Sequence, residues 1–394
     1  MELTEKQKQG LNTAIERYLN EERYTIISGY AGTGKSTLVK FIIDALPDID
    51  PDQDVVFTSF TGKATQVLAK KGNKNTSTLH KLLYKSVPMP DGTFKRIPVT
   101  HIPYKIVVVD EISMAPASLI SRLMNYDVYI IGLGDPFQLP PVDKNEDNHL
   151  LDNPHIFLDE IMRQAAESEI IQLTMKIRNK EPIPYMKGKE VQIIKKEELN
   201  TGMLMWANQI LAATNATRVR INNEMRQLLG RGDTPEDGDK VICCRNYWDT
   251  QSDQETALIN GTIGTISNSF QSFHSIPAFL TSERKPLKVD VLCAEFEGDC
   301  GEHYGILNMD KKMILEGEKS LDWKTEYRLG KQRPALIPLE FTYAYAITCH
   351  KSQGSEWDKV LVIEEKFPFN EEEHARWLYT ACTRASEKLV LVRP

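Results

Sequence analysis

Apolar residues follow two different patterns in the first third of the chain. Near the start they recur at close to helical spacing, which predicts an amphipathic helix over residues 4–20. Short uninterrupted apolar runs come next, at residues 24–27, 54–58, 105–109 and 127–132. Such runs are typical of parallel strands that are buried on both faces, and helical patterns follow the first two of them. The first part of the chain is therefore predicted to form a parallel α/β sheet.

A hairpin pattern interrupts this predicted sheet at residues 84–104. The Pro-Asp-Gly-Thr sequence at residues 90–93 is a turn sequence between two short extended arms. Three basic residues and Phe94 lie close to this turn. Two interpretations remain open, a surface connection or a wedge that contacts nucleic acid.

Short extended runs and turns fill residues 236–336. Asn260 and Gly261 stand between two apolar arms, which is a strong short-range sign of a hairpin, and residues 288–292 form another short extended run. The pattern predicts a small β-rich, barrel-like insertion, in which residues 297–333 carry too few signals for assignment.

Sheet-like patterns return on either side of this insertion. Residues 209–215 predict a strand that ends in a turn, with a helix over residues 216–229. After the insertion, extended apolar runs occupy residues 338–346, 360–363 and 389–392. Before the last run, Asn370 and Glu373 have the spacing of a capped helix start. These runs predict a second parallel sheet.

Composition narrows the class of protein only slightly. The chain has 394 residues, enough for two or three domains, and its 41% hydrophobic and 26% charged residues are ordinary for a globular protein. The net charge of −7 does not exclude nucleic acid, because phosphate contacts need only a local basic strip and backbone donors. The six cysteines form no C-x-x-C pair, which favours free thiols in a reducing cytosol. No apolar run approaches the roughly 18 residues of a membrane span, and the polar start does not indicate export.

The clearest chemical motif begins where the first predicted strand ends. Residues 29–36 read Gly-Tyr-Ala-Gly-Thr-Gly-Lys-Ser, which matches G-x-x-x-x-G-K-[ST] between a strand and a helix. Glycines in such a loop let backbone N–H groups surround a polyphosphate, while the lysine reaches the β- and γ-phosphates and the hydroxyl can bind Mg²⁺. A chance glycine turn is the alternative, and it rarely falls between a strand and a helix. The predicted nucleotide-binding residues of this loop are Gly29, Gly32, Thr33, Gly34, Lys35, Ser36 and Thr37.

Two carboxylates and an amide follow later strands of the same predicted sheet. Asp110 comes directly after the run at residues 105–109, where it is placed to hold Mg²⁺ together with Ser36. Glu111 is placed to take the proton of an attacking water. Gln138 follows the next strand and is placed to contact the γ-phosphate or its water.

Gln7 has two interpretations. As the last residue of a Thr4-x-x-Gln7 capping box, it would satisfy backbone donors at the start of the first helix. Alternatively, its amide can donate to adenine and accept from it, which would select ATP. The spacing alone favours the cap.

Three of these motifs, in this order, resemble those of superfamily 1 helicases. They are the loop at residues 29–36, the Asp-Glu pair at residues 110–111, and the Gly-Asp-Pro-Phe-Gln-Leu-Pro-Pro sequence at residues 134–141. The proline-rich third motif resembles branch 1B, the RecD-like and Dda-like 5′-to-3′ DNA helicases. Residues 158–164 resemble the fourth motif of that family, which implies that Arg163 contacts phosphate.

The resemblance continues near the end of the chain. Residues 377–385 resemble the sixth motif, which implies that Arg384 is a second arginine across the ATP cleft. Residues 347–357 closely resemble the fifth motif, which implies that Gln353 and Gly354 approach the nucleotide.

Nucleic-acid contacts are predicted from the fifth motif, from the hairpin, and from polar residues at strand ends, where open α/β sheets bind ligands. A lone histidine such as His80 is more often a structural hydrogen-bonding residue. The predicted nucleic-acid-binding residues are Thr58, Thr61, Lys63, His80, Phe94, Asn215, His350, Lys351 and Ser352.

The resemblance implies an α/β fold with two RecA-like P-loop domains, each with a parallel sheet. The first comprises residues 1–154 with the hairpin insertion at 84–104. The second is split into residues 155–235 and 337–394 around the β-rich insertion at 236–336. ATP and Mg²⁺ are the implied cofactors, bound by the first domain and completed by the two arginines of the second.

The implied activity is ATP-dependent movement 5′ to 3′ on single-stranded DNA, with unwinding of duplex. Expected partners are single-stranded DNA, junctions of single- and double-stranded DNA, a single-strand-binding protein, and replication or recombination proteins. The protein is expected to be a monomer without a membrane partner, in the cytoplasm or, if phage-encoded, in the host cytoplasm. Two alternatives stay open, an ATP-gated DNA clamp or loader without processive unwinding and an RNA helicase of the same superfamily.

Overall fold

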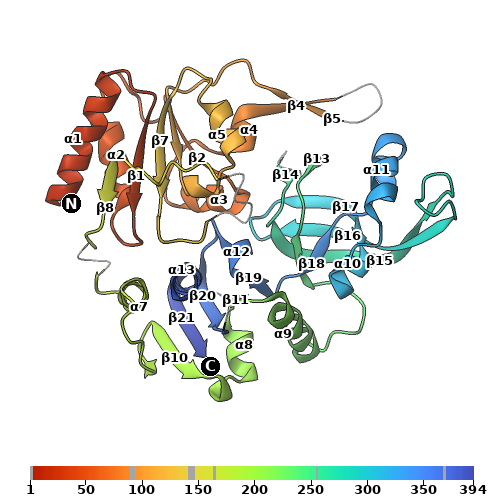
Figure 1. The fold of residues 1–394 in the computed structure, drawn as a ribbon. Helices are drawn as coiled ribbons and strands as arrows, with labels where there is room; N and C mark the ends of the chain where they lie inside the picture. Colours follow the sequence, from red (N-terminus) through yellow and green to blue (C-terminus); the bar gives the residue numbers. More distant parts are fainter. Residues whose placement is uncertain (1–2, 89–93, 141–146, 163–165, 254–255, 367–369) are drawn as a thin grey trace. The chain divides into compact units, whose positions relative to one another are not determined.

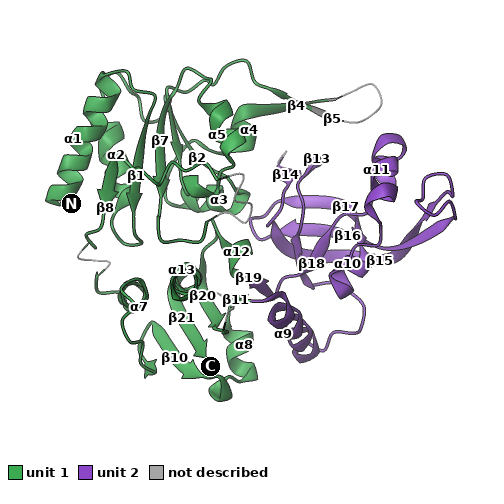
Figure 2. Ribbon diagram, in the orientation of Figure 1, with its two compact units in different colours: residues 1–213, 348–394 green, residues 214–347 purple. Residues whose placement is uncertain are grey.

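The computed structural model describes residues 3–88, 94–140, 147–162, 166–253, 256–366 and 370–394. Contacts divide the chain into two compact units (Figure 2). Unit 1 comprises Met1–Ala213 and Thr348–Pro394, and unit 2 comprises Thr214–Ile347. Unit 2 is therefore one continuous stretch of chain inserted into a discontinuous unit 1.

The first sheet of unit 1 is six-stranded and parallel throughout, in the order β3-β2-β6-β7-β1-β8 (Figure 1). Its strands are β1 (Tyr24–Gly29), β2 (Val55–Ser59), β3 (Thr76–Thr78), β6 (Ile106–Val109), β7 (Tyr129–Gly134) and β8 (Ile156–Leu158). The helices of this part of the chain are α1 (Glu5–Leu19), α2 (Lys35–Ala45), α3 (Gly62–Lys70), α4 (Leu79–Leu83), η1 (Ile112–Met114) and α5 (Ala117–Leu123). The predicted parallel sheet is confirmed.

The central strand β6 explains why the apolar runs are continuous. All four of its residues are buried. Successive side chains of a strand point to opposite faces, and here Val108 joins one apolar core while Val107 and Val109 join the core on the other face. Strand β8 pairs in parallel with β1, so this sheet extends past the predicted boundary at residue 154.

The second sheet follows the order β19-β11-β20-β21-β10-β9, with parallel pairs from β11 to β10 and the antiparallel β9 at its edge. Its strands are β9 (Met186–Lys187), β10 (Val191–Lys195), β11 (Gln209–Ala212), β19 (Ala346–Thr348), β20 (Trp357–Ile363) and β21 (Ala385–Arg393). Its helices are α7 (Glu169–Arg178), η3 (Lys196–Glu198), α8 (Thr201–Trp206), α12 (Cys349–Ser352) and α13 (Glu371–Cys382). The predicted cap of α13 is confirmed, because the Asn370 side chain accepts a hydrogen bond from the Glu373 N–H.

The hairpin predicted within the first sheet domain is confirmed. β4 (Tyr84–Pro88) pairs antiparallel with β5 (Phe94–Pro98), as Figure 1 shows. Residues 89–93 at its turn and the side chain of Phe94 lie outside the described part of the structure.

Unit 2 is built on a five-stranded antiparallel sheet in the order β17-β16-β15-β12-β18. Its strands, with the separate pair β13 and β14, are β12 (Lys240–Cys243), β13 (Tyr247–Gln251), β14 (Ala257–Leu258), β15 (Ile263–Ile276), β16 (Leu287–Gly298), β17 (His303–Asp310) and β18 (Phe341–Tyr343). Its helices are α9 (Asn215–Leu228), α10 (Lys311–Glu316), α11 (Trp323–Gln332) and η4 (Pro334–Leu336). The unassigned residues 297–333 thus contain β17, α10 and α11.

Two sequence-based expectations about unit 2 are wrong. The turn at Asn260 and Gly261 exists, with Gly261 at φ 91°, but its arms do not form a hairpin with each other. β14 pairs with β13, whereas β15 pairs with β12 and along most of its length with β16. The extended run at residues 338–346 predicts a strand of the second parallel sheet, but β18 within it pairs with β12 in the antiparallel sheet.

Unit 2 has two apolar cores along the long β15–β16 pair. One core contains Phe296, Tyr304 and Phe341 and lies under β12, β17 and β18. The other, which we call the distal core, contains Ile276, Leu280, Val289, Val291, Cys293, Leu321 and Leu329. No described helix is long and apolar enough to cross a membrane.

Candidate active site

The loop between β1 and α2 has the backbone conformation that a phosphate loop requires. Gly32 and Gly34 have φ values of 78° and 79°, in the left-handed region that favours glycine. A Cβ at Gly34 would also lie 2.6 Å from the Gln7 amide nitrogen. Because Gly34 is the N-cap, no side chain caps the N–H groups in the first turn of α2. Those N–H groups and the positive end of the helix dipole form a site for an anion.

Lys35 at the start of α2 is engaged by the loop itself. Its ammonium group donates to the carbonyl oxygens of Gly29 at 2.6 Å and Tyr30 at 3.0 Å. Thr33 is buried and its hydroxyl donates to the same Tyr30 carbonyl at 2.8 Å. Ser36 is exposed and Thr37 is half-buried at the surface of α2.

Gln7 is confirmed as a helix-capping residue. Its side-chain oxygen accepts from the Thr4 N–H at 3.1 Å, and the Thr4 side chain accepts from the Gln7 N–H. The amide nitrogen of Gln7 donates to the Thr33 carbonyl at 3.2 Å, so Gln7 also supports the phosphate loop. A role in recognising adenine stays a prediction.

Asp110 and Glu111 lie at the carboxyl end of β6, beside the end of β7. An Asp110 carboxylate oxygen accepts from the Glu111 N–H at 3.0 Å. Glu111 has φ 49°, which is uncommon for a residue with a Cβ, and such strained backbone clusters at functional sites.

The Glu111 carboxylate faces the second sheet. Its Oε1 lies 3.4 Å from Nη1 of Arg384, and its buried Oε2 has no hydrogen-bond partner among the described residues. Burial raises the pKa of Glu111, and the nearby Arg384 guanidinium only partly opposes that rise. A carboxylate with a raised pKa and an unused acceptor oxygen suits a group that takes a proton from water.

Arg384 follows α13 and lies beside Glu111, while its role at ATP stays a prediction. It is 5% exposed, and its guanidinium also donates to the carbonyl oxygens of Thr380 at 3.1 Å and Ser355 at 3.3 Å. These bonds fix the arginine against Glu111 of the first sheet. Arg163, the other predicted arginine, lies outside the described residues.

The fifth-motif residues contact the same region. The Gln353 amide nitrogen donates to the Leu139 carbonyl at 2.7 Å. The Gly354 backbone has φ 73°, and a Cβ there would lie 3.4 Å from Oε2 of Glu111. Gln138 is half-buried on the same loop as Leu139, and its contact with a γ-phosphate stays a prediction.

Tyr379 was not identified from the sequence, although it lies within the sixth motif. This side chain on α13 is 1% exposed, and its hydroxyl accepts from the Ala31 N–H of the phosphate loop at 2.9 Å. The same hydroxyl donates to the Asp135 carboxylate at 2.6 Å, and the ring packs edge-on against Phe137. A buried tyrosine hydroxyl normally needs a polar partner, but the sequence alone does not show that Tyr379 is buried.

Arg178 is a second residue that the sequence did not reveal. It ends α7, and its guanidinium carbon lies 3.9 Å from the ring centroid of Tyr30 in the phosphate loop. The Tyr30 ring also packs edge-on against Phe157. Tyr379 and Arg178 therefore connect two helices of the second sheet with the phosphate loop of the first.

Three of the predicted nucleic-acid-binding residues use their side chains in hydrogen bonds within the protein. Thr58 is fully buried and donates to the Val108 carbonyl at 2.8 Å. Ser352 is also fully buried and donates to the Cys349 carbonyl at 2.7 Å. Thr61 caps α3 by accepting from the Ala64 N–H. The hydroxyls of Thr58 and Ser352 are therefore not accessible to a bound strand in this conformation.

The other predicted contacts are more accessible. Lys63 lies with its ammonium 4.1 Å from the ring centroid of Trp357. His350 and Lys351 are half-buried at α12, and burial lowers the pKa of His350. Burial lowers the pKa of His80 to about 4, with a smaller effect from Arg96, so this histidine is neutral at physiological pH.

Asn215 begins α9 in unit 2, where its side-chain oxygen accepts from Arg218 Nε at 3.2 Å. The nucleic-acid role of this residue and of the accessible residues above stays a prediction.

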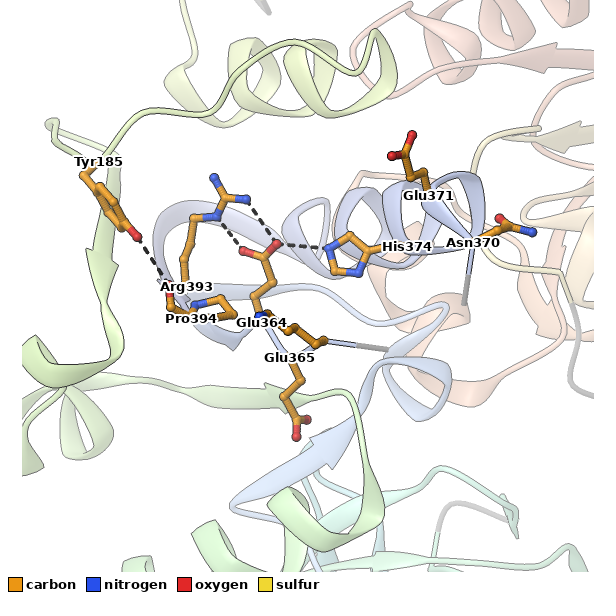
Figure 3. A pocket seen from close by; sticks show the side chains of 9 residues that line it. Tyr185, Glu364, Glu365, Asn370, Glu371, His374, Arg393 and Pro394 are labelled. Atoms are coloured by element: carbon orange, nitrogen blue, oxygen red, sulfur yellow. Dashed lines mark hydrogen bonds and ion pairs between the residues drawn. The ribbon is translucent and has the colours of Figure 1, made fainter. Parts of the chain in front are cut away.

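A cavity of about 680 Å³ lies elsewhere in unit 1 (Figure 3). Glu364 at its wall accepts from Arg393 at 2.6 Å and from His374 at 3.0 Å. Burial would raise the pKa of Glu364, but its hydrogen bonds with His374 and Arg393 lower it overall. None of the predicted site residues lines this cavity, so it is separate from the candidate active site.

Two family matches fit this arrangement. Residues 2–197 match the AAA domain family, and residues 343–392 match the UvrD-like helicase C-terminal domain family. The chain is 26% identical to the ATP-dependent RecD2 DNA helicase of Deinococcus radiodurans over 97% of its own length and 49% of that protein. It is 32% identical to the ATP-dependent DNA helicase dda of Enterobacteria phage T4 over 37% of its own length and 34% of that protein. The chain thus spans half or less of the length of these relatives.

Solved structures share the fold. A structure of two coordinating Pif1 helicases at forked double-stranded DNA has a TM-score of 0.54 at 18% identity, covering 100% of this chain and 95% of the other. Pif1 helicase from Bacteroides, in complex with ADP-AlF3 and single-stranded DNA, has a TM-score of 0.50 at 18% identity with the same coverage.

The two parallel sheets and the loop at the start of α2 define a P-loop protein with two RecA-like sheets. Within that class, the motif order and the family matches are specific. The chain belongs to the superfamily 1B helicases, the family of RecD-, Dda- and Pif1-like proteins.

Proposed function

We propose that this protein is an ATP-dependent DNA helicase that moves 5′ to 3′ on single-stranded DNA and unwinds duplex. The observation that carries the proposal is the approach of Arg384 to Glu111 at 3.4 Å. This contact joins the Arg384 guanidinium, just after α13, to the Glu111 carboxylate, just after β6. Arginines in such positions stabilise the charge that develops during phosphoryl transfer.

The residues of the phosphate loop fit the triphosphate of ATP. Gly32, Gly34 and the first turn of α2 offer backbone N–H groups, and Lys35 would exchange its two carbonyl partners for phosphate oxygens. Ser36 and Asp110 carry the oxygen ligands that Mg²⁺ prefers, and the ion would neutralise phosphate charge. The unpartnered Oε2 of Glu111 would accept a proton from the attacking water.

Contacts between the two sheets of unit 1 support a coupling of ATP hydrolysis to movement. Arg384, Tyr379 and Gln353 all contact segments that end strands of the first sheet. A change at the phosphates therefore alters how the second sheet docks on the first. A strand bound across both sheets would be shifted by each round of closing and opening.

A strand-displacement assay tests this proposal and its alternatives. DNA and RNA duplexes with either a 5′ or a 3′ single-stranded tail are mixed with the protein and ATP. We expect displacement only for DNA with a 5′ tail. A 3′ preference would contradict the direction, and displacement of RNA would favour an RNA helicase. ATP hydrolysis without any displacement would favour a clamp or loader.

Arg384 gives a direct test of the ATP site. We expect Arg384→Ala to lower kcat for ATP hydrolysis by about 10³-fold or more, because arginine fingers in related sites contribute about 10³ to 10⁵. ATP binding should persist, because the phosphate loop is intact. Arg376→Ala on the same helix is the control, since its guanidinium contacts the Pro136 carbonyl and not Glu111. A kcat within a few-fold of wild type in Arg384→Ala would contradict the assignment.

A further inference from the structure

One helix of unit 2 presents aromatic rings to solvent. Trp323 and Tyr327 lie about one turn apart on α11 and are 71% and 59% exposed. Aromatic side chains usually contribute to cores or interfaces, so two adjacent exposed rings indicate a binding surface.

The opposite face of α11 holds the helix in place without these rings. Leu329 is fully buried in the distal core of unit 2, and the Thr325 hydroxyl accepts from the Ser282 N–H at 3.0 Å. Arg328 donates to the Thr281 carbonyl. Asp322 caps the helix, and although burial would raise its pKa, hydrogen bonds from Thr325 and Ser282 lower it to about 2. The exposed rings therefore stand on a fixed platform.

A lysine accompanies each ring on the exposed face. Lys324 Nζ lies 5.7 Å from the ring centroid of Trp323, and Lys331 Nζ lies 4.3 Å from that of Tyr327. Gly330 lies on the same face, at helical spacing from both rings. A Cβ there would meet only the Cδ1 of Ile337 at 3.9 Å, so packing does not require glycine, which destabilises a helix relative to alanine. The glycine leaves room for a ligand to approach the helix closely.

We propose that Trp323, Lys324, Tyr327, Gly330 and Lys331, the α11 stripe, bind single-stranded nucleic acid. Unpaired bases stack on exposed aromatic rings, and ammonium groups beside those rings attract the phosphates between the bases. This site is additional to the strand path of the proposed function and does not need the ATP site.

Charge on α11 favours an anionic partner such as nucleic acid over a basic or purely apolar one. Glu326 lies on another face, where Arg245 and Lys319 pair with it. Asp322 is engaged in the helix cap. The stripe itself therefore carries two lysines and no carboxylate. Regularly spaced phosphates between stacked bases match a lysine beside each ring. An acidic protein segment is the alternative that the binding measurement excludes or supports.

The test measures binding of the full chain to an oligothymidylate of about 30 nucleotides over a range of salt concentrations. We expect Trp323→Ala with Tyr327→Ala to weaken binding about fivefold or more at every salt concentration. We expect Lys324→Ala with Lys331→Ala to reduce the slope of log K against log salt by about 1.4, because each single-strand phosphate contact contributes about 0.7. All four residues are at the surface, so the variants should fold.

A matched control exists on the neighbouring strands β15 and β16 of unit 2. Phe273 on β15 is 54% exposed and has Lys288 Nζ 4.4 Å from its ring centroid. Phe273 and Ile276 are three residues apart, so Phe273 points away from the face that packs on α11. Phe273→Ala with Lys288→Ala should therefore leave both affinity and salt slope unchanged. An equal loss in this control would overturn the proposal, because it would indicate a general surface effect.

Tryptophan fluorescence gives a direct second measurement. A base stacked on Trp323 should quench its emission, so the quenching by oligothymidylate should be smaller in Trp323→Phe than in wild type. Equal quenching, or unchanged affinity in both double variants, would overturn the proposal and leave a protein as the partner of the stripe. The variants retain every residue of the ATP site. If the wild-type protein showed no ATP hydrolysis stimulated by single-stranded DNA, this would contradict the proposed function. It would leave the proposal for the α11 stripe standing.

Discussion

Glu111 and Lys35 belong to the same candidate active site but are held in different ways. Glu111 has an unusual backbone conformation, an arginine at 3.4 Å and a buried oxygen without a partner among the described residues. Lys35 is held by two carbonyl oxygens of its own loop. One residue is thus placed for chemistry and the other for binding, so their substitution should have different effects.

We expect Glu111→Gln to bind ATP almost as well as wild type while kcat falls about 10²- to 10⁴-fold, the range of a general base. Lys35→Ala should weaken ATP binding as well as turnover, because it removes a charge that contacts phosphate. Nucleotide titration and steady-state hydrolysis with single-stranded DNA measure both quantities. Normal strand-stimulated hydrolysis by Glu111→Gln would show that another group accepts the proton.

The pH dependence of kcat offers an independent check. Only the ionised form of Glu111 can accept a proton, and burial raises its pKa. As pH falls, kcat should therefore decline at a higher pH than the value of about 4.3 for an ordinary glutamate would give. The low residual rate of Glu111→Gln should lack this decline. An identical acid limb in both proteins would assign it to another group.

Tyr379→Phe separates positioning from packing, because it keeps the ring and removes the hydroxyl. Ala31 N–H and the Asp135 carboxylate each lose a partner, and we expect kcat to fall about tenfold, since a shift of α13 also moves Arg384. ATP affinity should change little. Tyr304→Phe is the control, because Tyr304 is equally buried, 1% exposed, in the other unit. Equal losses of kcat in the two variants would indicate a general effect on stability.

Local motifs predicted much of this site, because a phosphate loop and strand-end carboxylates need particular residues at fixed spacing. Arg384 was singled out by family resemblance and not by spacing, and its distance of 3.4 Å from Glu111 could not be read from the sequence. Tyr379 was missed because its role depends on two segments that are more than 240 residues away in sequence. The burial of Thr58 and Ser352 could not be predicted from the sequence either. A polar residue at a strand end or in a helix can form a hydrogen bond within the protein as readily as with a ligand.

At the scale of elements, pairing partners were harder to predict than the elements themselves. Four of the six strands of the first sheet, β1, β2, β6 and β7, agree with the predicted runs within about two residues, because continuous apolar runs mark strands buried on both faces. The two edge strands β3 and β8 were not predicted, because each has only three residues. Strand β18 has the same kind of sequence but pairs with β12 in the antiparallel sheet. The Asn-Gly turn likewise gave a correct local conformation and a wrong pairing. Periodicity is a local property, whereas pairing depends on residues far along the chain.

The hairpin β4–β5 carries a prediction at this scale. If it separates the strands of a duplex, shortening residues 88–96 to a tight turn should abolish strand displacement. ATP hydrolysis stimulated by single-stranded DNA should remain, because none of the ATP-site residues is altered. Both activities are measured on the same preparation. A parallel loss of the two would mean that the hairpin supports the fold.

At the scale of the whole molecule, stability should depend on pH through Glu364. Its hydrogen bonds with Arg393 and His374 lower its pKa in the folded protein, although burial opposes this. A lowered pKa stabilises the fold above the unfolded value of about 4.3, and this contribution is lost as pH falls further through the folded value.

We therefore expect Glu364→Gln to lower the free energy of unfolding at neutral pH by about 2 kcal/mol. The difference from wild type should shrink as the pH falls below the unfolded value of about 4.3 and through the lower pKa that Glu364 has in the folded protein. Denaturant titrations at several pH values measure it. Glu365→Gln is the matched control at the wall of the same cavity. A difference that stays constant with pH would mean that charge on Glu364 is not what stabilises the fold.

The discontinuity of unit 1 sets an order of events during synthesis. The first sheet is complete once Leu158 has been made, and unit 2 is one uninterrupted stretch of chain. Strands β10 and β11, by contrast, pair in parallel with β21 and β20, which are made more than 140 residues later. At about 5 to 20 residues per second, these apolar strands wait on the order of ten seconds for their partners. During that interval the nascent chain exposes two unpaired strand edges, and a chaperone bound to residues 191–212 would protect it from aggregation.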